Sequence, residues 1–171
     1  MNIVQTLARR RVPLGFVAAL STIVLAHPTW ATWRVGLVFA LLGEAVRIWA
    51  AGHLEKSREV TRSGPYRWTR HPLYAGSAII ALGIVIASRS WIVVALVLIY
   101  ITATLTAAIR TEEAFLRDAF GDTYDRYRSS SAAPMARAFS VARALRNREY
   151  RAAAGLVAGF ALLALKIAAS L

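Results

Sequence analysis

Histidine, arginine and tyrosine side chains, which could bind an anion or move a proton, are concentrated in residues 64–76, which read GPYRWTRHPLYAG. Gly64-Pro65 is typical of a turn, and Pro72 fits the first turn of a helix because its missing N–H is harmless there. His71 would then lie at a helix amino terminus, which suits an anionic group such as a carboxylate. The alternative is an interfacial anchor, since Tyr, Trp and Arg gather at headgroup depth.

Two adjacent carboxylates, Glu112 and Glu113, follow a long apolar run of the sequence. Carboxylates at the end of a membrane span are costly unless each has a partner. Candidate partners are Arg110, Arg117 and the ammonium or ribose hydroxyl groups of a ligand. The alternative is that both carboxylates cap a surface helix and pair with neighbouring arginines.

An amphipathic helix is predicted directly after these carboxylates. Its apolar positions recur at spacings of four, four and three residues, at Leu116, Phe120, Tyr124 and Tyr127. This period is that of a helix which continues or follows the apolar run along the membrane surface. Gly121 interrupts the pattern.

Polar residues elsewhere in the apolar runs give less specific signals. Glu44 and Arg47 lie three residues apart, so we expect an ion pair that faces the bundle interior, with a functional and a packing role both open. His27 and His53 lack the companions that a metal site needs. The sequence has no cysteine, which excludes disulfides, thiol nucleophiles and Cys-based zinc sites, and no metal is expected.

Five apolar segments could position these residues across a membrane: 12–26, 35–51, 73–87, 91–109 and 152–170. A span requires about 20 mostly apolar residues, and the charged residues of this chain are bunched between the segments. Only three residues separate the third and fourth segments, which predicts an antiparallel helical hairpin. We therefore expect an all-α fold, a polytopic membrane helical bundle of about five transmembrane helices, in one domain over residues 1–171.

Basic residues alternate in number between successive loops, as expected for five crossings. Three arginines precede the first segment, five basic residues lie between the second and third, and nine follow the fourth, whereas the other two connections have one arginine each. The amino terminus and the loop before residue 73 should therefore be cytoplasmic, and the carboxyl terminus outside. This bias accounts for the net charge of +12 without a nucleic-acid partner. Alternatively, the first segment is a cleaved secretory signal.

The two polar clusters together resemble the isoprenylcysteine carboxyl methyltransferase and phospholipid methyltransferase family. The pattern is Gly-Pro-Tyr-x-x-x-Arg-His-Pro-x-Tyr-x-Gly, followed by Glu-Glu and by Phe-Gly-x-x-Tyr-x-x-Tyr. The resemblance covers residues 40–128 and is specific, because two separated motifs occur in order with a helical hairpin between them. It implies a membrane enzyme that encloses S-adenosylmethionine between a cytoplasmic cofactor-binding loop and the helix with the paired glutamates.

The resemblance also implies roles for particular residues. Carried over by motif position, the cofactor-binding residues are Val60, Thr61, Tyr66, His71, Pro72, Leu73, Tyr74 and Glu112. Val60 and Thr61 would contribute backbone groups. Arg110 and Glu113 are the predicted catalytic residues: Glu113 would support Glu112, and Arg110 would orient an acceptor carboxylate bidentately. The basic segment 129–151 does not identify the substrate.

The implied reaction is methyl transfer from S-adenosylmethionine to a lipophilic acceptor that enters from the bilayer, with membrane lipids as the other expected partners. Because the methyl donor is already activated, aligning the reactants and excluding water should suffice. An amine acceptor, as in phospholipid N-methylation, would need a base such as Glu112 or His71. A non-catalytic scaffold whose basic tail binds anionic lipids is the alternative from another class. No motif reports the oligomeric state.

Overall fold

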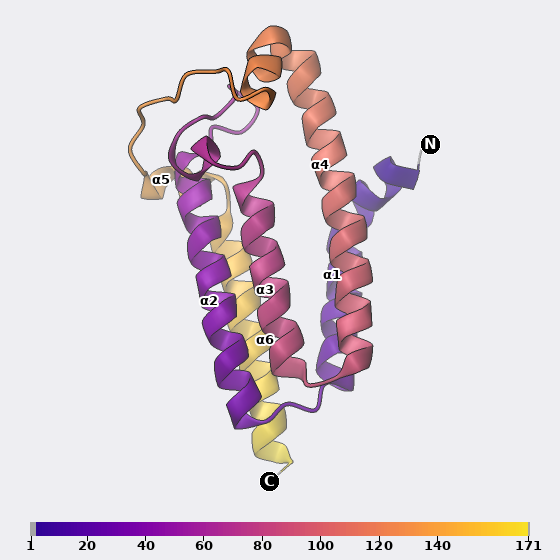
Figure 1. Cartoon of the computed structure of the whole chain (residues 1–171). Helices are drawn as coiled ribbons and strands as arrows, with labels where there is room; N and C mark the ends of the chain where they lie inside the picture. The colour runs from indigo at the N-terminus through magenta and orange to yellow at the C-terminus, as the bar shows by residue number, and fades with distance from the viewer. Residues whose placement is uncertain (1–2, 171) are drawn as a thin grey trace.

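Long helices running side by side make up most of the protein (Figure 1). The computed structural model describes the backbone of residues 3–170 and the side chains of residues 14–170. In chain order the helices are α1 (Ile3–Leu25), α2 (Trp30–His53), the 3-10 helix η1 (Gly64–Arg67), α3 (Pro72–Ser88), α4 (Trp91–Arg128), α5 (Val141–Arg146) and α6 (Glu149–Ala169). No strand occurs between residues 3 and 170, which confirms the predicted all-α class.

Helices occupy all five segments that were predicted to cross the membrane. Three of them, α2, α4 and α6, are long and apolar enough to do so, whereas α3 and the Leu14–Leu25 part of α1 are shorter apolar helices. At about 1.5 Å per residue, α3 is roughly 25 Å long, close to the hydrocarbon thickness of a bilayer. Large apolar side chains such as Phe16, Ile99 and Leu165 are exposed, as lipid-facing residues are. The chain is an integral membrane helical bundle.

The side chains of Arg9, Arg10 and Arg11, which entered the topology prediction, lie outside the described residues.

Helix boundaries differ from the predicted ones where local capping extends a helix. α2 begins at Trp30 rather than near residue 35, because Thr29 and Thr32 form a reciprocal capping box. α4 continues past residue 109 to Arg128, so the predicted amphipathic helix is an extension of the fourth span. A sharp kink at Gly121, with φ 44° and ψ −123°, turns the end of this helix, in a conformation that favours glycine.

Small residues bring α2 and α3 into unusually close contact. A Cβ atom added to Gly43 of α2 would lie 2.6 Å from the carbonyl oxygen of Gly76, and one added to Gly83 of α3 would lie 2.5 Å from that of Gly36. The two glycines of each helix, Gly36 and Gly43 on α2 and Gly76 and Gly83 on α3, are seven residues apart, so they lie on one face of that helix. Small residues at such a spacing are a sequence signal of close helix packing in membranes.

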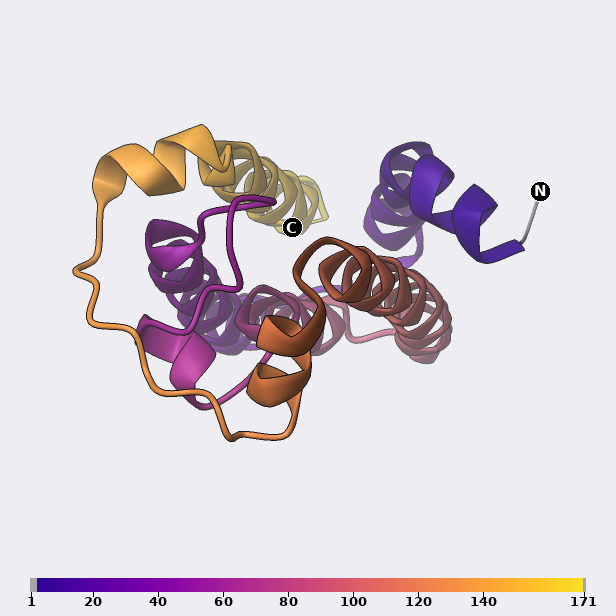
Figure 2. The same cartoon turned by 90° about the horizontal axis from the view of Figure 1, so that it is seen from above.

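The remaining helices form two sides of the molecule (Figure 2). α6 packs on α2, where the indole of Trp33 donates a hydrogen bond of 2.9 Å to the carbonyl oxygen of Phe160. α4 packs mainly against α1 and less extensively against α3. The turn at Arg89, in the left-handed conformation, joins α3 and α4 in the predicted antiparallel hairpin. As a result, the amino end of α3 and residues 110–128 of α4 lie at the same end of the bundle.

Candidate active site

The two polar clusters of the sequence meet where α3 begins beside α4. Nε2 of His71, the residue before α3, lies 3.1 Å from a carboxylate oxygen of Glu113. The hydroxyl of Tyr74, one turn into α3, donates a hydrogen bond of 2.7 Å to Glu112. The rings of His71 and Tyr74 stack with their centroids 5.6 Å apart. Histidine, tyrosine and two carboxylates thus form one group, although they are about 40 residues apart in the sequence.

Charge and hydrogen bonding fix the ionisation of Glu113. Burial alone would raise its pKa, but the hydrogen bond with His71 and the nearby Arg70 guanidinium, at 3.3 Å, outweigh burial and bring the pKa below its usual value. An ionised carboxylate can only accept, so Nε2 of His71 must be the donor. The other ring nitrogen of His71, Nδ1, is buried and has no hydrogen-bond partner within residues 14–170. A group from a ligand could satisfy it.

Tyr66 adds a buried hydroxyl to this group. It lies in η1, where Gly64-Pro65 forms the predicted turn, and only 5% of its surface is exposed. Burial first, and then the negative charge of Glu112, raise the pKa of Tyr66, so its hydroxyl stays protonated and able to donate. The hydroxyl of Tyr127, beyond the Gly121 kink of α4, donates a hydrogen bond of 2.8 Å to the Tyr66 carbonyl and holds this turn in place.

Pro72 and Leu73 form the first turn of α3 above a buried ion cluster. Pro72 is fully buried, and the carbonyl oxygen of Leu73 accepts a hydrogen bond from Arg47 of α2 at 3.4 Å. Arg47 lies 3.7 Å from Glu44, as the sequence predicted, but it is much closer to Glu149 of α6, at 2.6 Å. This cluster joins α2, α3 and α6 directly beneath the amino end of α3.

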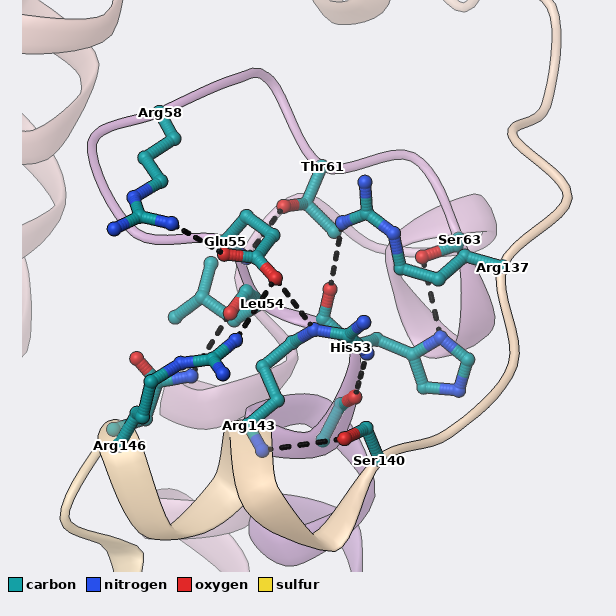
Figure 3. Close-up of polar contacts among 12 residues, drawn as sticks. His53, Leu54, Glu55, Arg58, Thr61, Ser63, Arg137, Ser140, Arg143 and Arg146 are labelled. Carbon is teal, nitrogen blue, oxygen red and sulfur yellow. Dashed lines mark hydrogen bonds and ion pairs between the residues drawn. The ribbon is translucent and has the colours of Figure 1, made fainter.

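Val60 and Thr61 lie in an irregular loop, residues 54–63, that the carboxyl-terminal part of the chain covers (Figure 3). Both residues are buried. The hydroxyl of Thr61 accepts from the backbone N–H of Glu55 at 3.2 Å and donates to Glu59 at 3.4 Å. The Thr61 side chain is therefore used within the loop, which leaves backbone groups for any ligand.

We name residues 132–147, which cover this loop, the basic strap. Arg137 of the strap makes two hydrogen bonds to Glu59, at 2.6 and 2.7 Å. Arg143 donates to Glu55 at 2.8 Å (Figure 3). The hydrogen bond from Arg143 lowers the pKa of Glu55. The Phe139 ring packs on Gly52 so closely that a Cβ there would overlap it. The strap is thus part of the folded structure and fixes the loop that precedes η1.

Arg110, the predicted residue at the substrate end, is not joined to this group. Its side chain is exposed on α4, and no hydrogen bond or ion pair within residues 14–170 links it to His71, Tyr74 or the paired glutamates. Its predicted role at the substrate end stays a prediction.

Sequence reasoning missed Glu149, Tyr127's contact with the Tyr66 carbonyl and the strap. Glu149 carried a usable signal, because it is the only acidic residue after Asp125 and stands at the start of the last apolar segment. The strap carried none, since ion pairs between residues about 80 to 90 positions apart have no sequence periodicity. Among the described residues, no group of three or more His, Cys, Asp or Glu side chains could hold a metal ion.

The fold and this group of residues define a polytopic helical membrane protein with a polar site where α3 and α4 meet. The chain belongs to the phospholipid methyltransferase family, whose family model matches residues 14–123. No solved structure matches the chain.

Relatives of this chain include proteins named for metal resistance and proteins named for isoprenylcysteine methylation. The cobalt-zinc-cadmium resistance protein CzcN of Cupriavidus metallidurans is 32% identical over 119 residues, which are 64% of this chain and 54% of that protein. An Oryza sativa protein named "Probable protein-S-isoprenylcysteine O-methyltransferase" is 29% identical over 66% of this chain and 71% of its own length. The protein-S-isoprenylcysteine O-methyltransferase of Schizosaccharomyces pombe is 33% identical over 46% of this chain and 33% of its own. The chain thus spans about half the length of the first of these relatives.

Proposed function

We propose that the chain is an S-adenosylmethionine-dependent methyltransferase that acts on a lipophilic acceptor in the membrane, in the manner of an isoprenylcysteine carboxyl O-methyltransferase. The observation that carries this proposal is the meeting of His71 and Tyr74 with Glu112 and Glu113 at one end of the bundle. Membership of the phospholipid methyltransferase family supports it, as does similarity to proteins named for isoprenylcysteine methylation.

The residues of the group fit S-adenosylmethionine, which carries a sulfonium, an ammonium, a carboxylate and ribose hydroxyls. Glu112 and Glu113 provide negative charge and acceptors for its cationic and hydroxyl groups. The buried Nδ1 of His71 needs a partner that a ligand can provide, and the positive end of the α3 helix dipole suits a carboxylate. When bound, S-adenosylmethionine supplies an activated methyl group.

The chain's own residues would then bind the cofactor, orient the acceptor and exclude water. Arg70 and His71 hold Glu113 ionised, and the protonated hydroxyl of Tyr66 acts as a buried donor. An acceptor carboxylate needs no base, and Arg110, exposed near the paired glutamates, would orient it. An amine acceptor would have to lose a proton, for which Glu112 or His71 is placed within the group.

Phospholipid N-methylation is the second candidate, and the description of the matching family favours it. The scaffold alternative is weakened by the basic strap. Its arginines Arg137 and Arg143 are bound to Glu59 and Glu55, so they are not available as a headgroup-binding tail.

A transfer assay with methyl-labelled S-adenosylmethionine tests the proposal. Purified protein would be incubated in vesicles with either a prenylcysteine carboxylate or phosphatidylethanolamine. Methyl esters release methanol in base, whereas N-methyl groups do not, so base treatment identifies the product. Base-labile label in the prenylcysteine sample is the expected result. Stable label in phosphatidylethanolamine would support the second candidate, and label in neither sample, from a protein that binds the cofactor, would contradict both acceptors.

A further inference from the structure

A cavity of about 430 Å³ lies beside the group just described. It is open to the surface and is lined by side chains from residues 62–70, the end of α4 and residues 130–134. Four arginines line it, and no acidic side chain in the described part of the chain does: Arg62, Arg67, Arg70 and Arg128. His71, Tyr74 and the paired glutamates of α4 are not among its lining residues, so it is a separate site that shares Tyr66 and Arg70 with the cofactor group at its edge.

The arginines of this cavity differ from those of the basic strap in their partners. Arg70 is paired with Glu113, but Arg62, Arg67 and Arg128 form no ion pair with any carboxylate between residues 14 and 170. Within the same residues, the one hydrogen bond of the Arg67 side chain goes to the neutral carbonyl of Met135, at 3.2 Å. Nε of Arg62 is buried without a hydrogen-bond partner in that part of the chain. A buried guanidinium N–H without an acceptor is costly, so an anionic ligand would stabilise it.

An exposed tryptophan pair beside the cavity is typical of the depth of lipid headgroups. Trp68 lines the cavity, is 76% exposed, and lies with its ring centroid 5.6 Å from that of Trp49 on the partly exposed surface of α2. Tryptophan pairs on the outer surface of a membrane bundle are typical of the bilayer interface. The anion that is abundant at this depth is the phosphate group of a lipid.

We propose that this cavity binds the phosphate group of an anionic membrane lipid. Several guanidinium groups can hold phosphate oxygens through paired, charge-assisted hydrogen bonds, and the volume is in the range of small-ligand sites. The hydroxyl of Ser130 and the Trp68 ring would contact the rest of the headgroup. A bound lipid would fasten residues 62–70 to the end of α4. Free phosphate offers the same oxygens, so the test separates the two sources.

The test measures lipid binding without any cofactor, so its outcome is independent of methyl transfer. Native mass spectrometry of the protein in neutral detergent would follow a titration with short-chain phosphatidylglycerol, with phosphatidylcholine of the same chain length as the comparison. The variants are Arg67→Gln with Arg128→Gln, and Arg128→Gln alone in case the double variant fails to fold. The matched control is Arg126→Gln, an exposed position two residues away that does not line the cavity.

Wild type should bind phosphatidylglycerol roughly tenfold or more tightly than phosphatidylcholine. The double variant should lose about tenfold in affinity and Arg128→Gln a smaller amount, while Arg126→Gln binds as wild type does. Equal binding of the two lipids would overturn the proposal, as would an equal loss in Arg126→Gln. If inorganic phosphate displaced the lipid at an equal concentration, the ligand would be free phosphate and the lipid proposal would be overturned.

Discussion

At the scale of single residues, Glu113 links the ionisation of the site to the stability of the fold. Its pKa is lower in the folded chain than the ordinary value of 4.5, because His71 and Arg70 favour the carboxylate despite its burial. A carboxyl group whose pKa is lowered by folding stabilises the folded state at pH values above its ordinary pKa. This stabilisation is lost as the pH falls through the lowered, folded-state pKa.

We therefore expect the thermal midpoint of the protein in detergent to fall as the pH is lowered from about 5. The fall should be shallower in Glu113→Gln, which has no carboxylate to protonate. Thermal denaturation between pH 3 and pH 7 checks this prediction, with Asp118→Asn, at an exposed position of the same helix, as the control. If the thermal midpoints of wild type and Glu113→Gln depended on pH in the same way, His71 and Arg70 would not stabilise the Glu113 carboxylate.

Residue chemistry explains how much of the site the sequence could predict. His71, Tyr74, Glu112 and Glu113 stand out because a helix start and two carboxylates at a span end each demand partners, and here they satisfy each other. Glu149 stands out in the sequence as an isolated acidic residue, but its partner could not be predicted from it. Its bond to Arg47 joins residues 102 positions apart, and this depends on how α6 packs rather than on any local pattern.

At the scale of helices, close contact between α2 and α3 sets the position of the site, because α3 carries both His71 at its start and Tyr74. This contact depends on glycine at positions where any side chain would overlap the neighbouring backbone. The sequence predicted the helices from their hydrophobicity. It could not predict that α4 contacts α1 more than its hairpin partner α3, because the hydrophobicity of a segment does not indicate which helix it packs on.

Gly43→Ala should destabilise the protein by about 1 to 3 kcal/mol, since the added methyl would lie 2.6 Å from a backbone oxygen of Gly76. The matched control is Gly155→Ala in α6, where nothing lies within 4 Å of the added atom. That control should be neutral or stabilising by roughly 0.5 to 1 kcal/mol, as expected for alanine within a helix. Thermal midpoints and elution profiles in one detergent provide the comparison. Similar effects of the two substitutions would contradict the close packing of α2 and α3.

At the scale of the whole molecule, the basic strap connects the carboxyl-terminal part of the chain to the loop of Val60 and Thr61. Arg137 and Glu59 form its most complete ion pair, with side chains only 19% and 27% exposed. Removing one partner of such a pair leaves the other charge partly buried, which is more costly than losing an exposed pair.

Arg137→Glu should therefore lower stability by about 1 to 3 kcal/mol, because two carboxylates would then face each other. It should also weaken cofactor binding, because the strap would no longer fix the loop of Val60 and Thr61. The double variant Arg137→Glu with Glu59→Arg restores opposite charges and should recover part of both losses. A double-mutant cycle on thermal stability and cofactor affinity measures this recovery. Additive losses in the double variant would show that the two side chains do not interact.

The arrangement across the membrane is a further prediction for the whole molecule. The distribution of arginines predicts that the loop before α3 lies in the cytoplasm and the turn between α3 and α4 outside. Because the sequence has no cysteine, single cysteines can be introduced at Lys56 and Arg89, which are both exposed. An impermeant maleimide added to intact cells should label the cysteine at position 89 and not the one at position 56. The reverse pattern would invert the topology and place the site outside.

We propose that the start of α3 and the carboxylates of α4 form one cofactor site. Calorimetric titration of the detergent-purified protein with S-adenosylhomocysteine tests it most directly, with wild type, His71→Ala, Glu112→Gln and the exposed control Arg126→Gln side by side. We predict micromolar binding to wild type and to the control, and a loss of roughly ten- to hundredfold in each site variant, as when a hydrogen bond to a charged group is removed. A folded wild type that binds no S-adenosylhomocysteine, or site variants that bind as tightly as the control, would contradict the claim.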